Sequence, residues 1–263
     1  MALECEGLSI DIGGTSVVRD VSLSVGDGER VGLIGSSGSG KSMIVRSVMG
    51  LLPPTAHVSG SVRLHGNELA GLDDASMSLL RGSAIGMVFQ NPQNALNPVL
   101  TVAQQIELPL RLHYDLSGGE RRARVLRMLG KVGLPESFAD RSVMALSGGQ
   151  QQRVGIATAL VTSPRMIIAD EPTTALDATT QRQIVDLLRE LVDELGASML
   201  FITHDFAVLS RATTRCYVLH EGRIVESGST DGILDHPRTT YAKTLVEAAK
   251  ALSLHVEEGN GDE

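Results

Sequence analysis

Long apolar runs and a rich set of cysteines are both missing from this sequence of 263 residues. No run of about 18 apolar residues occurs, and no basic-then-apolar segment opens the chain, so the sequence predicts neither a membrane span nor a secretion signal. The two cysteines, Cys5 and Cys216, are far apart, and two thiols alone cannot ligate an iron–sulfur cluster. We therefore expect a cytoplasmic polypeptide in which both thiols are reduced and structural.

Basic residues are also in short supply. Asp and Glu outnumber Lys and Arg by 31 to 23, which gives a formal net charge of −8. Such a balance argues against a broad electrostatic grip on nucleic acid or anionic lipid, although a local basic groove stays open as an alternative. With 42% hydrophobic and 21% charged residues, the chain has enough apolar material for one large or two small globular domains.

Strand and helix patterns alternate along most of the chain. Short β-type runs, separated by turn residues, occur at 3–12, 17–25, 30–34, 60–64, 84–89, 166–169 and 198–203. Helical spacing of apolar residues occurs at 42–52, over much of 102–159, at 181–195 and at 241–254. This alternation predicts an α/β fold with a mostly parallel, doubly wound sheet and a helical insert. Residues 257–263 hold four acids and no apolar side chain, which is typical of a frayed tail.

A glycine-rich loop follows the strand at 30–34 and precedes a helix. It fits the pattern GxxxxGK[ST], with the residues Gly35, Ser36, Ser37, Gly38, Ser39, Gly40, Lys41 and Ser42. The glycines allow backbone amides to turn inward around β- and γ-phosphates, the Lys41 ammonium neutralises phosphate charge, and the Ser42 hydroxyl can ligate Mg²⁺. Only four of the 23 Lys and Arg residues are lysines, so the choice of Lys at position 41 supports a phosphate site.

Polar residues end three of the predicted strands. Asp170 ends the strand at 166–169, where it can hold Mg²⁺, and Glu171 points to the other side and could orient or deprotonate an attacking water. Either acid alone could simply suit a loop. His204 ends the strand at 198–203 and could contact a γ-phosphate, although a lone histidine is more often structural. Gln90 ends the strand at 84–89 and is a candidate ligand of Mg²⁺ or of water.

The tetrapeptide Leu-Ser-Gly-Gly occurs twice, in Leu116–Glu120 and in Leu146–Gln150. Each copy has Ser followed three residues later by Glu or Gln, which is the capping-box pattern, so both predict a helix start. We expect the first copy to do only that. The second copy begins a helix that leads into the Asp170 strand, where exposed amides and the helix dipole can stabilise an anion.

In these residues the sequence resembles the ATP-binding cassette (ABC) ATPases over residues 3–250. The loop at Gly35–Ser42 matches Walker A, Gln90 the Q-loop, Leu146–Gln150 the LSGGQ signature, Ile167–Asp170 Walker B, Ala175–Asp177 the D-loop and His204 the H-loop. The resemblance makes Glu171, His204 and Gln90 the catalytic residues, and Ser42, Gln90 and Asp170 the Mg²⁺ ligands. It assigns ATP contacts to Walker A and to Ile12, Ser147, Gly148, Gly149, Gln150 and Asp177.

The resemblance also implies an architecture and partners. It implies one cassette over residues 1–250, with a P-loop NTPase (RecA-like) core, an N-terminal antiparallel β subdomain, a helical subdomain at about 91–160, and a tail at 251–263. It implies a dimer with an identical or different cassette, in which Ser147, Gly148 and Gly149 serve the partner's ATP. The dimer would lie on the cytoplasmic face of a membrane, bound to a permease that receives solute from an extracytoplasmic binding protein, without nucleic acid.

Within the superfamily, three stretches resemble the dipeptide, oligopeptide and nickel importers: Phe89–Val102, Ala169–Asp177, and His236-Pro237 through Tyr241 and Leu245. Ile12 stands where many cassettes stack an aromatic ring on adenine, so base recognition is expected to be weaker or merely apolar. The short C-terminus resembles the nickel-type subunits. The alternative is a soluble cassette in a non-transport complex, such as a phosphonate C-P lyase assembly.

Overall fold

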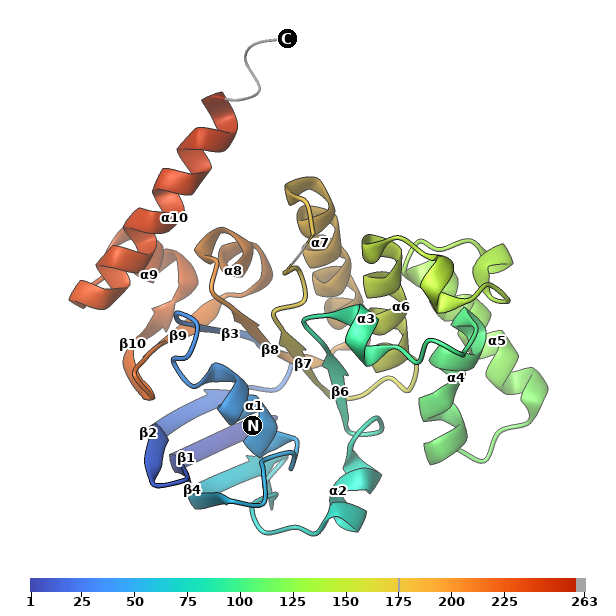
Figure 1. Cartoon of the computed structure of the whole chain (residues 1–263), viewed down its shortest axis with the longest axis horizontal. Helices are drawn as coiled ribbons and strands as arrows, with labels where there is room; N and C mark the ends of the chain where they lie inside the picture. Colours follow the sequence, from blue (N-terminus) through green and yellow to red (C-terminus); the bar gives the residue numbers. More distant parts are fainter. Residues whose placement is uncertain (175, 259–263) are drawn as a thin grey trace. The chain divides into compact units, whose positions relative to one another are not determined.

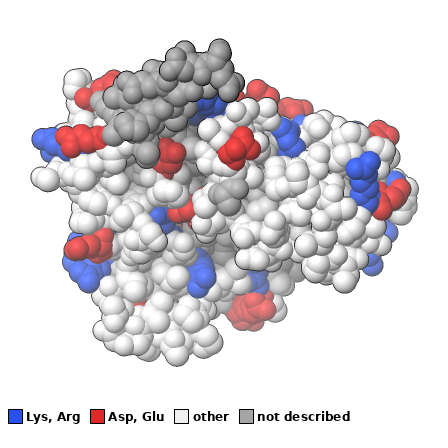
Figure 2. All heavy atoms as spheres, turned by 45° about the horizontal axis from the view of Figure 1, so that its top comes forward, with Lys and Arg blue, Asp and Glu red and all other residues white. Residues whose placement is uncertain are grey.

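The computed structural model describes residues 1–174 and 176–258, with side chains up to Ala249 (Figure 1). The chain forms two compact units, one made of Met1–Gly71 and Leu200–Glu263, the other of Leu72–Met199. No helix in the described residues is long and apolar enough to cross a bilayer. Acidic and basic side chains are interspersed on the face drawn in Figure 2 rather than gathered by sign.

The first unit contains an antiparallel sheet of four strands in the order β2-β1-β4-β5. Its strands are β1 (Leu3–Ile12), β2 (Thr15–Val25), β4 (Ala56–Leu64) and β5 (Asn67–Glu68). The pairing of β1 with β2 shifts between Cys5 and Leu8, and this irregularity keeps Cys5, Leu8 and Ile10 buried. This sheet confirms the predicted antiparallel N-terminal subdomain.

The first unit also contains strands in the order β10-β9-β3-β8. They are β3 (Arg30–Ile34), β8 (Ser198–Thr203), β9 (Arg215–His220) and β10 (Arg223–Ser229), and the first two residues of β8 belong to the second unit. Strand β9 runs parallel to β3 and antiparallel to β10. The helices of this unit are α1 (Lys41–Val48), α8 (Phe206–Ala212), α9 (Thr230–Asp235) and α10 (Thr240–Glu258).

The second unit combines parallel strands with the helical insert. Strands β6 (Ile85–Val88) and β7 (Met166–Asp170) pair in parallel, with Val88 opposite Ala169. The helices are α2 (Asp74–Leu80), α3 (Pro92–Ala95), α4 (Val102–His113), α5 (Gly118–Lys131), α6 (Gly148–Leu160) and α7 (Ala178–Leu195), with 3-10 turns at Glu136–Phe138 and Val143–Ala145. Helix α4 packs against both α5 and α6, so the helical stretch forms a packed group. The predicted fold class is confirmed.

The structure differs from the sequence-based expectations at several element ends. The first helix stops at Val48 instead of continuing to 52, because Gly50 takes a left-handed backbone (φ 63°) and Pro53 and Pro54 follow. Helix α7 begins three residues earlier than expected, because the Asp177 side chain caps it. Helix α10 includes Glu257 and Glu258, and the rest of the expected tail, at 259–263, lies outside the described residues. The sequence pattern did not predict the short elements between Phe206 and Asp235, which are α8, β9, β10 and α9.

Candidate functional site

The glycine-rich loop of the first unit joins β3 to α1 as predicted. Gly40, the residue before α1, has φ 109°, and a Cβ there would lie 2.8 Å from the Val17 carbonyl oxygen. Only glycine tolerates both the backbone conformation and this close approach. The loop therefore leads directly into the N-terminus of α1. The first backbone amides of a helix have no partners within the helix, so this end is a favourable place for an anion.

Lys41 is buried within this loop. Its side chain curls back, and Nζ donates hydrogen bonds to the carbonyl oxygens of Gly35 at 2.6 Å and Ser36 at 3.0 Å. A buried ammonium needs such acceptors, because desolvation without partners is costly. Backbone carbonyl groups of the loop therefore keep the Lys41 charge in a defined position.

The same loop has a buried hydroxyl that finds no hydrogen-bond partner among the described residues, the Oγ of Ser39. An orphaned buried donor is costly and calls for an acceptor. Phosphate oxygens are acceptors, so the residues of the loop fit a phosphate-bearing ligand. The Ser42 side chain is exposed, which leaves its hydroxyl accessible for Mg²⁺.

Two more predicted site residues lie in the first unit. His204 follows β8, the strand next to β3 in the sheet order, and its side chain is exposed. Ile12 ends β1 and is half-buried. The first unit therefore carries the phosphate loop, the histidine and the predicted apolar base contact.

The second unit brings Gln90 and Glu171 together. They follow the paired strands β6 and β7, and Gln90 Nε2 donates to Glu171 Oε2 at 3.1 Å. The Thr174 hydroxyl donates to the same carboxylate oxygen, also at 3.1 Å. Glu171 has φ 45°, a conformation that non-glycine residues rarely adopt, so the alternation of side chains along β7 ends at Asp170. A strained backbone held by two donors is typical of a functional position.

The second Leu-Ser-Gly-Gly copy starts α6 through a capping box. Gln150 N donates to Ser147 Oγ, and Ser147 N donates to Gln150 Oε1 at 3.0 Å. The two glycines face α7 and the loop before it, where a Cβ on Gly149 would lie 2.8 Å from Thr180 Cγ2. A side chain at Gly149 would therefore be crowded by Thr180, whereas a Cβ on Gly148 would make an ordinary contact with Leu176 Cδ2 at 3.7 Å.

Asp177 caps α7. Its carboxylate accepts hydrogen bonds from Thr180 N at 2.9 Å and Thr180 Oγ1 at 2.6 Å, and these bonds lower its pKa. Ala175, in the same predicted D-loop, lies outside the described residues. The Thr180 that is bonded to Asp177 is also the residue against which Gly149 packs, so the predicted signature and D-loop share one local structure.

Two residues near these groups were missed by sequence reasoning. Gln152 is buried on α6, and its Nε2 donates to the carbonyl oxygen of Phe89 at 3.3 Å, which ties the signature helix to the residue before Gln90. The other residue is Thr174, whose hydroxyl donates to the Glu171 carboxylate. Nothing in the local sequence marks either contact, because Phe89 is 63 positions from Gln152 and the Thr174 contact depends on the left-handed backbone of Glu171.

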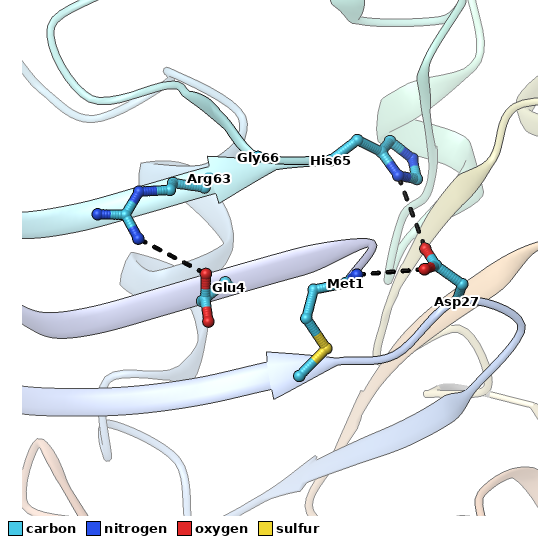
Figure 3. A pocket seen from close by; sticks show the side chains of 6 residues that line it. All are labelled: Met1, Glu4, Asp27, Arg63, His65 and Gly66. Atoms are coloured by element: carbon cyan, nitrogen blue, oxygen red, sulfur yellow. Dashed lines mark hydrogen bonds and ion pairs between the residues drawn. The ribbon is translucent and has the colours of Figure 1, made fainter.

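A pocket elsewhere in the first unit has a different character. It measures about 380 Å³ and lies over the antiparallel sheet. Figure 3 shows that its charges pair across it, with Arg63 facing Glu4 and Asp27 between His65 and the Met1 amine. Because these charges already neutralise one another, this pocket is a weaker candidate than the phosphate loop.

The chemistry divides between the units. The first holds a phosphate loop with a buried lysine, and the second holds a carboxylate positioned by an amide and a hydroxyl, beside the strand that ends in Asp170. No group of three or more His, Cys, Asp or Glu side chains in the described parts of the chain could hold a metal. A magnesium ion would therefore need phosphate oxygens as well as protein ligands, as is usual for Mg²⁺.

Known proteins resemble this chain in both sequence and structure. The family described as ABC transporter matches residues 18–174. A putative peptide import ATP-binding protein of Brucella abortus (strain 2308) is 43% identical over 253 residues, covering 94% of this chain and 76% of the relative. The oligopeptide transport ATP-binding protein OppD of Mycobacterium bovis is 44% identical over 240 residues, covering 90% of this chain and 39% of OppD.

Solved structures agree with the sequence relatives. The dimeric ATP-binding cassette MJ0796, in a post-hydrolysis state bound to ADP and Pi, has a TM-score of 0.77 and 36% identity, covering 87% of this chain and 98% of that one. The protein cbiO1 from Clostridium perfringens, part of the ABC transporter complex cbiONQ, has a TM-score of 0.79 and 30% identity, covering 89% of this chain and 91% of that one.

Proposed function

The chain belongs to the ATP-binding proteins of ABC transporters and is an ATPase, and we propose that it powers the import of peptides through a separate permease. The observation that carries the proposal is the 43% identity to a putative peptide import protein over 94% of the chain. Phe89–Val102 and His236–Tyr241 support the same subfamily. Both relatives described above are named for peptides, so we propose a peptide rather than nickel or a metal chelate as the solute.

The proposed chemistry is attack of water on the γ-phosphorus of ATP, with cleavage of the bond to the bridging oxygen to give ADP and phosphate. The loop amides and Lys41 bind the β- and γ-phosphates. Glu171 accepts a proton from the attacking water, and the hydrogen bonds from Gln90 and Thr174 hold its carboxylate in one orientation. His204 contacts the γ-phosphate.

Magnesium would neutralise charge on the phosphates, with Ser42, Asp170 and Gln90 as its protein ligands. The Nε2 end of Gln90 is bonded to Glu171, which leaves its Oε1 end for the metal. Ile12 makes an apolar contact with the base.

We further propose that two cassettes work as a pair, as the dimeric MJ0796 does. Ser147, Gly148, Gly149 and Gln150 then serve the partner's ATP, with Asp177 close to the same interface. The exposed amides at the start of α6 suit a γ-phosphate. The assembly would bind its permease at the cytoplasmic face of the membrane, and a solute-binding protein would deliver the peptide from outside.

The first experiment tests ATP hydrolysis in vesicles that contain the chain with its permease. Lys41→Ala should abolish hydrolysis and peptide uptake, and Glu171→Gln should keep ATP binding while it stalls turnover. Lys131→Ala is the matched control, because Lys131 pairs on the surface with Glu194 at 2.8 Å. Unchanged hydrolysis in both Lys41→Ala and Glu171→Gln would refute the proposal.

The second experiment tests the partners. Mass spectrometry of co-purifying proteins should find two permease subunits and a solute-binding protein, and that binding protein should bind peptides rather than nickel chelates. Recovery of a soluble enzyme complex in their place would favour the non-transport alternative.

A further inference from the structure

The C-terminal helix α10 makes a direct contact with the phosphate loop of the same unit. The Tyr241 hydroxyl oxygen accepts a hydrogen bond from Ser36 N at 2.9 Å. The Tyr241 ring stacks on His220, with ring centroids 3.8 Å apart and an interplanar angle of 24°. Tyr241 therefore contacts a loop residue that is 205 positions away in the sequence, and His220 packs against one face of its ring.

The Ser36 amide that donates to Tyr241 belongs to the same peptide group as the Gly35 carbonyl that accepts from Lys41. Gly35 C=O and Ser36 N–H are the two ends of one peptide group, and no described peptide bond is cis. In a trans peptide the two ends point to opposite sides of one rigid plane. Lys41 Nζ donates to the Gly35 end at 2.6 Å while Tyr241 accepts from the Ser36 end, so the two contacts together set the rotation of this plane.

The start of α10 is anchored independently. Glu226 on β10 has a side chain that is only 2% exposed, and its carboxylate accepts hydrogen bonds from Arg238 N, Thr239 N and the Thr239 hydroxyl, each at 2.9 Å. Burial would raise the pKa of Glu226, but these hydrogen bonds outweigh it and the pKa is lowered. The carboxylate thus stays ionised and keeps the residues just before Tyr241 in place.

The turn that follows His220, between β9 and β10, is also bonded to the phosphate loop. Gly222 N donates to the Ser39 carbonyl oxygen at 3.0 Å, and a Cβ on Gly35 would lie 2.3 Å from the Leu219 carbonyl oxygen. Tyr241 therefore lies against a support that is itself bonded to the phosphate loop, so its hydroxyl is fixed relative to Ser36.

We propose that Tyr241 is a positioning residue that orients the Gly35–Ser36 peptide and, through it, the Lys41 ammonium for nucleotide phosphate. The inference rests on the proposed function only in that Lys41 binds the phosphates of ATP. It gives α10 a role in nucleotide binding, because a displacement of this helix would release the peptide plane and loosen the lysine.

The test is the dissociation constant for a fluorescent ATP analogue, mant-ATP, measured on the purified full chain. Tyr241→Phe keeps the ring and its stack on His220 and removes only the hydroxyl. Loss of one hydrogen bond that preorganises the loop should raise the dissociation constant about 3- to 10-fold. The thermal midpoint, measured in parallel, shows whether the variant is folded at the assay temperature.

Tyr217→Phe is the matched control within the same unit. The Tyr217 hydroxyl accepts hydrogen bonds from Ser24 N at 3.1 Å and Arg215 at 2.6 Å, and neither residue belongs to the phosphate loop. This variant should lower the thermal midpoint without changing the dissociation constant. An equal weakening of mant-ATP binding in both variants would overturn the inference, as would unchanged binding in Tyr241→Phe.

A double-mutant cycle separates action through Lys41 from a general effect on the loop. In a Lys41→Ala background, Tyr241→Phe should cause no further loss of affinity. If the two losses multiply, Tyr241 does not act through the lysine and the inference is wrong. If the wild-type chain binds no mant-ATP at all, the proposed function fails first, which is a distinguishable result.

Discussion

The two Leu-Ser-Gly-Gly segments have the same local structure and different surroundings. Ser117 and Ser147 each cap a helix, α5 or α6, through a complete capping box. A Cβ on Gly119 would meet nothing within 4 Å, whereas a Cβ on Gly149 would lie 2.8 Å from Thr180 Cγ2. Four residues are therefore enough to specify a helix start, while the packing around that start differs between the two segments.

The largest expected difference concerns catalysis. Ser117→Ala and Ser147→Ala each remove one cap, so each should cost about 1 kcal/mol of stability. Only Ser147→Ala should also lower ATP hydrolysis in the reconstituted transporter, by at least about tenfold, because Ser147 is proposed to face the partner's nucleotide. Hydrolysis rates and thermal midpoints of the two variants check this. An equal loss of hydrolysis in both would remove the distinction between the segments.

The next difference concerns packing. Gly149→Ala should lower the free energy of unfolding by about 1–3 kcal/mol, because Thr180 is β-branched and its hydroxyl is bonded to Asp177, so its methyl group cannot turn away freely. Gly119→Ala should be neutral or stabilising by up to about 1 kcal/mol, since it gains helix propensity in open space.

A rescue variant sharpens the packing prediction. Thr180→Ser removes Cγ2 and keeps the hydroxyl for Asp177, so it should restore most of the stability that Gly149→Ala loses. Urea unfolding of the single and double variants measures this effect. If Thr180→Ser gives no rescue, crowding at Thr180 is not the cause of the loss.

The smallest difference concerns pH. In the first segment, hydrogen bonds from Ser117 lower the pKa of Glu120, whereas the second has the neutral Gln150 at the same position. Because the folded pKa lies below the unfolded value, the stabilisation by Glu120 is present above about pH 4.3 and is lost as the pH falls through the folded pKa. Glu120→Gln should flatten this part of the stability profile. Gln150→Glu should add a similar acid-sensitive step, and thermal midpoints between pH 3 and 6 check both.

Much of the fold could be predicted from local patterns. The strands predicted at 3–12, 30–34 and 198–203 match the observed strands residue for residue, because alternating or continuous apolar residues are typical of strands. The short helices α8 and α9 could not be predicted, since six or seven residues give too few turns for a helical period. The predicted first helix, at 42–52, extends beyond the observed one, because its apolar pattern continues past Gly50.

In the candidate site, too, some features could be predicted from local sequence and others could not. The phosphate loop and the strand that ends in Asp170 are continuous in sequence, so their residue types and spacing identified them. The donors that hold Glu171 include Gln90, which is 81 positions away, and its contact depends on the parallel pairing of β6 and β7. Thr174 lies close in sequence, but its contact depends on the left-handed backbone of Glu171, which no periodicity indicates.

Local sequence is enough to specify the phosphate loop, the capping boxes of α5 and α6 and the strand-helix alternation, because each depends on neighbours within a few residues. Tertiary packing, in contrast, places Gly149 against Thr180, leaves space for a Cβ at Gly119, and brings the Tyr241 hydroxyl within hydrogen-bond distance of Ser36 N. Those contacts join segments from different elements. They form only when burial of apolar surface has brought the elements together, and no local pattern encodes which polar groups then meet.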